Sequence, residues 1–443
     1  MKRASLLIIL ICFILSVSTG YAAESAPLIN PDNLIYRPLN FAPPKAERVE
    51  LENGIVLYIL EDHELPLLKI SAIIKTGSIY DPKGKEGLAE ITGTVMRTGG
   101  TKNRTGGEID EELEYFAGDI SVSVNMESGS ATLSVLKKDI ADGLDIFSDI
   151  IMNPVFDEKK LETARNLKIE DLRRVYDEPQ KMAFREFKRL IYRGNERERL
   201  PSVKSVEKIT RGDLIRFRQR FFHPENMMMA VAGDITRDEA ISKINRYFGA
   251  WNRTGEEIKE IPCPEMDNDG TINYIYKEAP QSIIIMGCLA PDKKSPDFYP
   301  FTVLDFILGS GGFRSRIMRE VRNNAGLAYS AGSFYNGRSD YGIFGAYAFT
   351  KSSSTAEVLS LIMSIIDDVR ANKVEESELS WAKKSINNSF IFSFDSADKI
   401  AVQQMLIKYN KLPDDFLTTY RAKIEKVTIE DLKRVAKKYL SRN

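Results

Sequence analysis

The chain has 443 residues, which at roughly 100 to 200 residues per domain is enough for two or three domains with sizeable cores. It carries 62 Lys and Arg against 63 Asp and Glu, a net charge of −1, so bulk attraction to nucleic acid or to an anionic membrane is not expected. Three cysteines and two histidines leave little for a Cys/His metal site, which usually takes three or four of these ligands.

The N-terminus, residues 1–22, has the three-part layout of a secretory signal peptide. Lys2 and Arg3 precede an apolar run over 6–17, and small and polar residues follow. The run is shorter than the roughly 20 residues that cross a bilayer. We therefore expect cleavage after residue 22 or 23, no membrane attachment afterwards, and a periplasmic or secreted location.

Two cysteines, Cys263 and Cys288, remain in the expected mature chain. An exported chain could oxidise this pair to a disulfide. We favour the alternative of two unpaired thiols, because one lies near a predicted linker and the other in an apolar strand, and sequence alone cannot supply the geometry of a bridge.

Apolar strands and amphipathic helices then come in runs and not in strict alternation. Strands are predicted over 55–60, 67–74, 227–232 and 283–288, and Asn53-Gly54 is a hairpin-type turn signal ahead of the first. The early strands of each half lead into a long amphipathic helix. Runs of this kind favour an α+β fold over a doubly wound parallel sheet.

Two segments of the chain repeat one another. The sequence EKITRGDL at 207–214 recurs as EKVTIEDL at 425–432. Thr210 and Thr428 each precede a helical pattern and have an Asp three residues later, as a helix N-cap does. The chain is therefore expected to contain two copies of one unit.

The repeat predicts two domains, 34–253 and 271–443. A polar, proline-containing linker joins them over 254–270. The first copy continues after its last helix into the apolar strand 227–232, whereas the second copy stops at Asn443. The C-terminal domain is therefore expected to lack its closing strand.

A series of short motifs in a fixed order covers nearly the whole mature chain. It consists of Gly77-Ser78, Asp81-Pro82, Gly84, Gly87-Leu88-Ala89, Thr98-Gly99-Gly100-Thr101, Phe248-Gly249-Ala250-Trp251 and Gly326-Leu327-Ala328-Tyr329. In this order the motifs resemble the insulinase/pitrilysin family of zinc metallopeptidases, in its bacterial processing-protease-like branch. The resemblance implies two homologous α+β domains, each an antiparallel-rich sheet packed by helices, that form half of a clamshell.

The zinc motif of that family is absent from this chain. In active members a helix carries His-x-x-Glu-His, in which two imidazoles one turn apart hold zinc and the Glu activates water. The corresponding residues here are Glu90, Gly93 and Thr94, and the family's third ligand, a Glu, corresponds to Asp171. Two carboxylates are fewer ligands than a zinc site requires, so we expect no metal cofactor in this chain.

The second half retains the residues that the family directs toward the bound peptide. The pattern Arg-x-x-x-Gly-Leu-Ala-Tyr places Arg322 and Tyr329 where a cation and a phenol would hold a peptide carbonyl and stabilise its oxyanion. The run containing Gly309, Gly311 and Gly312 resembles the family's glycine turn, where related non-catalytic subunits touch substrate. A plain tight turn is the alternative for these glycines.

Two further features have simpler interpretations. His63 and His223 each lie at a predicted turn, and both are interpreted as solvated turn residues. The segment 120–124 resembles the family's substrate-binding strand, whose edge would pair with an extended peptide. Internal pairing of that edge is the alternative.

These observations favour an exported subunit that binds no metal and belongs to a two-chain zinc metallopeptidase. By the resemblance, a sister subunit of the same family would carry the zinc, and this chain would be inactive alone. The partners are then that zinc-bearing subunit and an unfolded peptide. The alternative function is a non-enzymatic scaffold or peptide-binding protein of the same fold.

Overall fold

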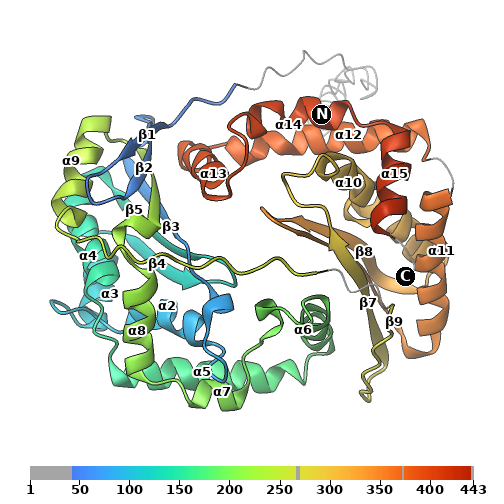
Figure 1. Ribbon diagram of the computed structural model, residues 1–443, viewed down its shortest axis with the longest axis horizontal. Helices are drawn as coiled ribbons and strands as arrows, with labels where there is room; N and C mark the ends of the chain where they lie inside the picture. The colour runs from blue at the N-terminus through green and yellow to red at the C-terminus, as the bar shows by residue number, and fades with distance from the viewer. Residues whose placement is uncertain (1–41, 266–269, 372–373, 441–443) are drawn as a thin grey trace, which may run out of the picture. The chain divides into compact units, whose positions relative to one another are not determined.

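The first of two β-sheets has six strands in the order β1-β2-β6-β3-β5-β4 (Figure 1). The computed structural model describes residues 42–265, 270–371 and 374–440, so the predicted signal peptide lies outside the described residues. All neighbouring strands are antiparallel except β2 and β6, which are parallel. The strands are β1 (Glu47–Glu50), β2 (Val56–Glu61), β3 (Leu67–Ile74), β4 (Asp119–Val124), β5 (Gly129–Leu136) and β6 (Met227–Gly233).

Strand β2 is apolar without interruption because helices cover both faces of its sheet. Leu57 and Ile59 point into the main core of the first half. On the other face the sheet packs against α13 (Ala397–Tyr409), a helix from the far end of the chain. The contacts join Val56, Tyr58, Leu60, Ile73, Ala230 and Ala232 to Ile400, Ala401 and Met405.

The helices of the first half pack on and around the main core, except for α6, which packs on the second sheet. Of these, α2 contacts β4, α4 contacts β5 and α9 contacts β2. The helices are α2 (Leu88–Thr98), α3 (Gly106–Tyr115), α4 (Ile140–Met152), α5 (Glu158–Val175), α6 (Pro179–Ile191), α7 (Val203–Glu207), α8 (Arg211–Phe221) and α9 (Arg237–Phe248).

The second sheet has three antiparallel strands in the order β7-β9-β8. Within the described residues no strand pairs with the outer edge of β7, although β3, which precedes α2 as β7 precedes α10, pairs there with β6. The elements of this half are β7 (Gln281–Ala290), β8 (Ala328–Gly337), β9 (Gly342–Lys351), α10 (Phe298–Asp305), α11 (Thr355–Ala371), α12 (Glu376–Phe390), α14 (Phe416–Glu425) and α15 (Ile429–Tyr439).

Each half lends a helix to the sheet of the other. While α13 covers the first sheet, α6 packs on the second, where Phe184 and Phe187 place their rings about 6 Å from the ring of Phe334 (6.1 and 6.0 Å). Neither helix could bury its apolar residues within its own half in the same way. This reciprocal exchange joins the two halves of residues 43–443 into one compact unit.

A buried ionic cluster adds polar contacts between the halves. Glu127, in the turn between β4 and β5, accepts hydrogen bonds from Arg197 Nε at 2.5 Å, Tyr341 Oη at 2.8 Å and Arg338 at 2.9 Å. Arg197 and Tyr341 are each 6% exposed. A charge so deeply buried is stable only when it is paired, as it is here.

The two predicted N-caps are confirmed. Asp213 Oδ2 accepts a hydrogen bond from the Thr210 backbone N–H at 2.9 Å at the start of α8, and Asp431 does the same for Thr428 at 3.1 Å at the start of α15. The predicted α+β fold is confirmed as well. No helix in the described part of the chain has the length and apolar character needed to cross a membrane.

Candidate functional site

The helix that resembles the zinc helix starts on a buried carboxylate. Asp81 accepts hydrogen bonds from the backbone N–H groups of Gly87 (2.7 Å) and Ala89 (2.9 Å), the first free donors of α2. Burial raises the pKa of Asp81 to about 7, against the opposing effect of these two hydrogen bonds. Asp81 therefore determines where α2 begins, and with it the direction in which Glu90 points.

Glu90 and Thr94 lie one turn apart on the exposed face of α2, as the two imidazoles of an active member would. Asp171 lies on the neighbouring helix α5. The ammonium group of Lys168, also on α5, lies 2.8 Å from a Glu90 carboxylate oxygen and 3.9 Å from an Asp171 oxygen. A cation supplied by the chain itself therefore pairs with Glu90 and lies close to Asp171, which offsets one of their two negative charges.

The position of the catalytic Glu is filled by backbone packing. Gly93 is buried on the side of α2 that packs against β4, and a Cβ atom there would lie 3.0 Å from the Val124 backbone nitrogen. Helix and strand would have to separate by a few tenths of an ångström to admit any side chain. Arg97 strengthens this contact, because its Nε donates a hydrogen bond to the Ile120 carbonyl at 2.8 Å.

These donors do not fit a zinc site. Glu90 and Asp171 are two oxygen ligands held by an ammonium group, and Gly93 and Thr94 add no imidazole. No cluster of three or more His, Cys, Asp or Glu suited to a metal ion occurs among the described residues.

The two histidines differ in environment. His63 is exposed, as expected, and pairs with Asp234 at 2.6 Å, which raises the pKa of His63. The interpretation of His223 as a solvated residue is wrong, because this side chain is 1% exposed and lies 3.0 Å from Glu225. The turn is covered by the rest of the fold, which sequence could not show.

The glycine turn of the second half combines two tightly packed glycines with one open one. It follows α10 through a π-helical turn over 306–310. A Cβ at Gly309 would lie 2.1 Å from the Ser333 backbone nitrogen, and one at Gly311 would lie 2.5 Å from the Phe306 carbonyl oxygen. Gly312 is exposed, faces open space and has a φ of 73°, in the left-handed region. Of the three, only Gly312 has open space beside its Cα, although its carbonyl already accepts hydrogen bonds from the Ser315 N–H at 3.0 Å and Oγ at 2.6 Å.

Arg322 lies between two exposed aromatic rings. Its guanidinium carbon is 5.1 Å from the centre of the Phe313 ring and 5.0 Å from that of Tyr329. Phe313 is 64% exposed and Tyr329 79%. Within the described residues, no hydrogen bond or ion pair involves the guanidinium group or the Tyr329 hydroxyl. The edge of the guanidinium, with its N–H donors, therefore remains available.

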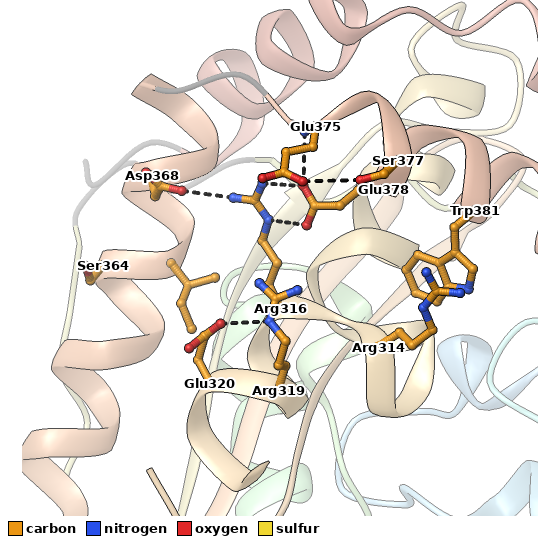
Figure 2. A pocket seen from close by; sticks show the side chains of 11 residues that line it. Arg314, Arg316, Arg319, Glu320, Ser364, Asp368, Glu375, Ser377, Glu378 and Trp381 are labelled. Atoms are coloured by element: carbon orange, nitrogen blue, oxygen red, sulfur yellow. Dashed lines mark hydrogen bonds and ion pairs between the residues drawn. The ribbon is translucent and has the colours of Figure 1, made fainter. Parts of the chain in front are cut away.

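The neighbouring arginines are all engaged. Arg319 pairs with Glu320 at 2.8 Å, and Arg314 stacks on Trp381 with its guanidinium carbon 5.0 Å from the ring centre. Arg316 is 8% exposed and binds Glu378 and Asp368 through contacts of 2.6 to 3.0 Å. Figure 2 shows these side chains around a polar pocket of about 500 Å³ behind the glycine turn.

The pocket is a structural network and not an open binding site. Arg316 reaches across it from the glycine turn to α12 and α11, so its ion pairs hold the turn against those helices (Figure 2). Figure 2 also shows Arg314 stacked against Trp381 at the other side of the pocket. The turn that carries Phe313 is therefore anchored from behind, while its front carries the exposed stack.

Two family models match the chain. The model described as insulinase (peptidase family M16) matches residues 59–200, and the model described as peptidase M16 inactive domain matches residues 208–386. A protein of Rickettsia bellii named an uncharacterized zinc protease is 25% identical over 334 residues, 74% of this chain and 80% of that protein. The protein YmxG of Bacillus subtilis, also named an uncharacterized zinc protease, is 22% identical over 383 residues, 85% of this chain and 92% of that one.

Solved structures share the fold. One is described as a peptidase M16 inactive domain from Pseudomonas fluorescens and matches with a TM-score of 0.82 at 23% identity, over 90% of this chain and 96% of that one. A protease from Helicobacter pylori matches with a TM-score of 0.80 at 21% identity, over 90% of this chain and 97% of that one. With two family models in sequence order over most of the described residues, this chain belongs to the insulinase family, peptidase family M16.

Proposed function

We propose that this chain is the exported, non-metal-binding subunit of a heteromeric zinc peptidase. A sister subunit of the same family supplies the zinc, which acts as the Lewis acid. This chain supplies Arg322 and Tyr329. The family membership and the match to the inactive-domain model support this division of work.

The unpaired guanidinium of Arg322 is the observation that carries the proposal. An arginine on a protein surface usually finds a carboxylate, as Arg319 does at 2.8 Å. Arg322 instead lies beside two aromatic rings, and within the described residues its N–H groups have no hydrogen-bond acceptor. The N–H groups of the guanidinium are donors with a positive charge behind them, and a peptide carbonyl oxygen, or the oxyanion derived from it, can accept their hydrogen bonds. The free hydroxyl of Tyr329 adds a further donor.

The first half supports the same division, because it cannot act as the zinc half. The ammonium of Lys168 pairs with Glu90 and lies close to Asp171, and Gly93 leaves no side chain to activate water. The outer edge of β4 is also partly occupied, since Arg97 donates to the Ile120 carbonyl. An extended substrate would displace Arg97 or bind on the partner's sheet.

The experiment mixes the purified chain with a zinc-bearing family member from the same genome and follows cleavage of an unfolded, internally quenched peptide. We expect cleavage to depend on both chains. Arg322→Ala or Tyr329→Phe should lower turnover by roughly tenfold to a thousandfold, as for the loss of one oxyanion donor. The matched control is Arg319→Ala, which removes an exposed arginine three residues away whose charge is already paired.

The outcomes separate the two candidate functions. Turnover that falls with Arg322→Ala but not with Arg319→Ala supports the proposal. Turnover that is the same in both variants removes Arg322 from the mechanism. Cleavage by the partner that does not change when this chain is added would leave the scaffold or peptide-binding function.

A further inference from the structure

The contacts of the Phe313 and Tyr329 rings with Arg322 are too weak to explain why both rings are exposed to solvent. Phe313 is 64% exposed and sits on the glycine turn, where the neighbouring Gly312 faces open space. A cation–π contact between an aromatic ring and a guanidinium near the surface is worth only about 0.5 to 1 kcal/mol. Tyr329 makes a second contact of this kind with Arg322. Most of the apolar surface of both rings is left in water.

A ligand that binds Arg322 comes to lie beside both rings. The ring centres lie about 5 Å from the guanidinium carbon, 5.1 Å for Phe313 and 5.0 Å for Tyr329. In an extended peptide, the side chains that precede and follow a carbonyl point to opposite faces of the strand. A carbonyl that accepts a hydrogen bond from Arg322 therefore has its two flanking side chains within reach of the Phe313 and Tyr329 rings.

We propose that Phe313 is a specificity-determining residue, and that the site selects peptides with two consecutive large apolar side chains around the carbonyl held by Arg322. This inference rests on the proposed function, because it assumes that Arg322 binds a peptide. It adds the class of substrate. Apolar side chains bury the exposed faces of the two rings, whereas polar side chains would lose water without a partner.

The position of Phe313 is fixed well enough for this role. Asn323 Nδ2 donates a hydrogen bond to the Phe313 carbonyl at 3.4 Å, which ties the turn to the segment that carries Arg322. Behind the turn, the buried ion pairs of Arg316 with Glu378 and Asp368 hold it in place (Figure 2). The ring is therefore presented by an anchored turn.

The test measures binding of two blocked, fluorescein-labelled peptides to the purified chain by fluorescence polarisation. Both are ten residues of alternating Gly and Ser, except for a central Leu-Phe in one and a central Ser-Asn in the other. We expect the Leu-Phe peptide to bind about tenfold more tightly, a difference of about 1.4 kcal/mol. Phe313→Ser should abolish this preference, and Phe313→Leu should restore part of it. Arg322→Ala should weaken the binding of both peptides.

The matched control is Phe392→Ser, which removes an equally exposed phenylalanine (69%) outside the stack and should leave the preference intact. Equal affinity of the chain for both peptides, or a preference that survives Phe313→Ser, overturns the inference about Phe313 and leaves the proposed peptide binding standing. Failure of both peptides to bind, even at millimolar concentration, overturns this inference, and the two-chain cleavage assay then decides the proposed function separately.

Discussion

The position of the Lys168 ammonium group leads to a prediction about zinc binding at the positions of the missing ligands. Replacing Glu90 and Thr94 by His would place two imidazoles one turn apart on the exposed face of α2, with Asp171 as a third ligand, which is the usual number of protein ligands in a catalytic zinc site. No side chain is needed at Gly93 for binding alone. We expect the double variant to bind zinc weakly while Lys168 is present, and tightly once Lys168 is replaced by Val.

The magnitude follows from the distances. The ammonium lies 3.9 Å from Asp171, and a dication about 4 Å from an ammonium is repelled by about 8 kcal/mol at an effective dielectric constant of 20. The flexible Lys168 side chain would move into water when zinc binds. The loss of zinc binding energy is then limited to the broken ion pair between Lys168 and Asp171 plus the remaining repulsion between the ammonium group and zinc. Together these amount to about 1.4 to 2.8 kcal/mol, a tenfold to hundredfold loss of zinc affinity.

The assay is competition for zinc against a chromophoric chelator. The matched control combines the two His substitutions with Lys160→Val, which removes an exposed lysine of the same helix and the same charge. Lys168→Val without the His substitutions should bind no zinc, since two carboxylates are too few ligands. Equal zinc affinity with and without Lys168 would refute the argument that this ammonium takes the place of a metal ion.

Three further outcomes are expected. Gly309→Ala should lower the free energy of unfolding, measured in urea, by about 1 to 3 kcal/mol, because the added methyl group meets backbone atoms. Gly312→Ala should lower it by only about 1 kcal/mol, because the cost there is the left-handed backbone conformation. Equal losses in the two variants would argue against a packing role for Gly309. Burial raises the pKa of Asp305 to about 6, so the folded state binds the proton of this carboxyl group more strongly than the unfolded state does. The free energy of unfolding should therefore fall as the pH rises from about 4 to 6, and Asp305→Asn should reduce this pH dependence. With Ellman's reagent at pH 8, the exposed Cys263 should react fast and Cys288 slowly, because burial raises the pKa of Cys288 to about 12; two fast thiols would contradict this.

Sequence patterns predicted the elements whose cause is local. The strands around β2, β3 and β6 and the two N-caps at Thr210 and Thr428 depend on residues within a few positions of one another, and the structure has them. The sequence did not show why β2 is apolar on both of its faces. Its unbroken apolar run is explained by α13, which covers the second face of the sheet and lies more than 300 residues further along the chain.

The burial and the contacts of the site residues could not be predicted from the sequence. His223 looked like a surface turn residue and is buried. Phe313 was not predicted to be a site residue, because nothing in a glycine-rich turn indicates that its aromatic residue will stack on an arginine nine positions later. The signal that could have drawn attention to it is the occurrence of a large apolar residue inside an otherwise small and polar turn.

The amino-acid sequence by itself determined the family, the α+β class and the chemical deficit at Glu90, Gly93 and Thr94, because residue types and short spacings carry that information. Only the tertiary structure decided what took the place of the missing ligands. Lys168 is 78 residues from Glu90 in the chain, and their contact exists because α5 packs against α2. Pairing between distant charges depends on how helices pack, and no local pattern encodes it.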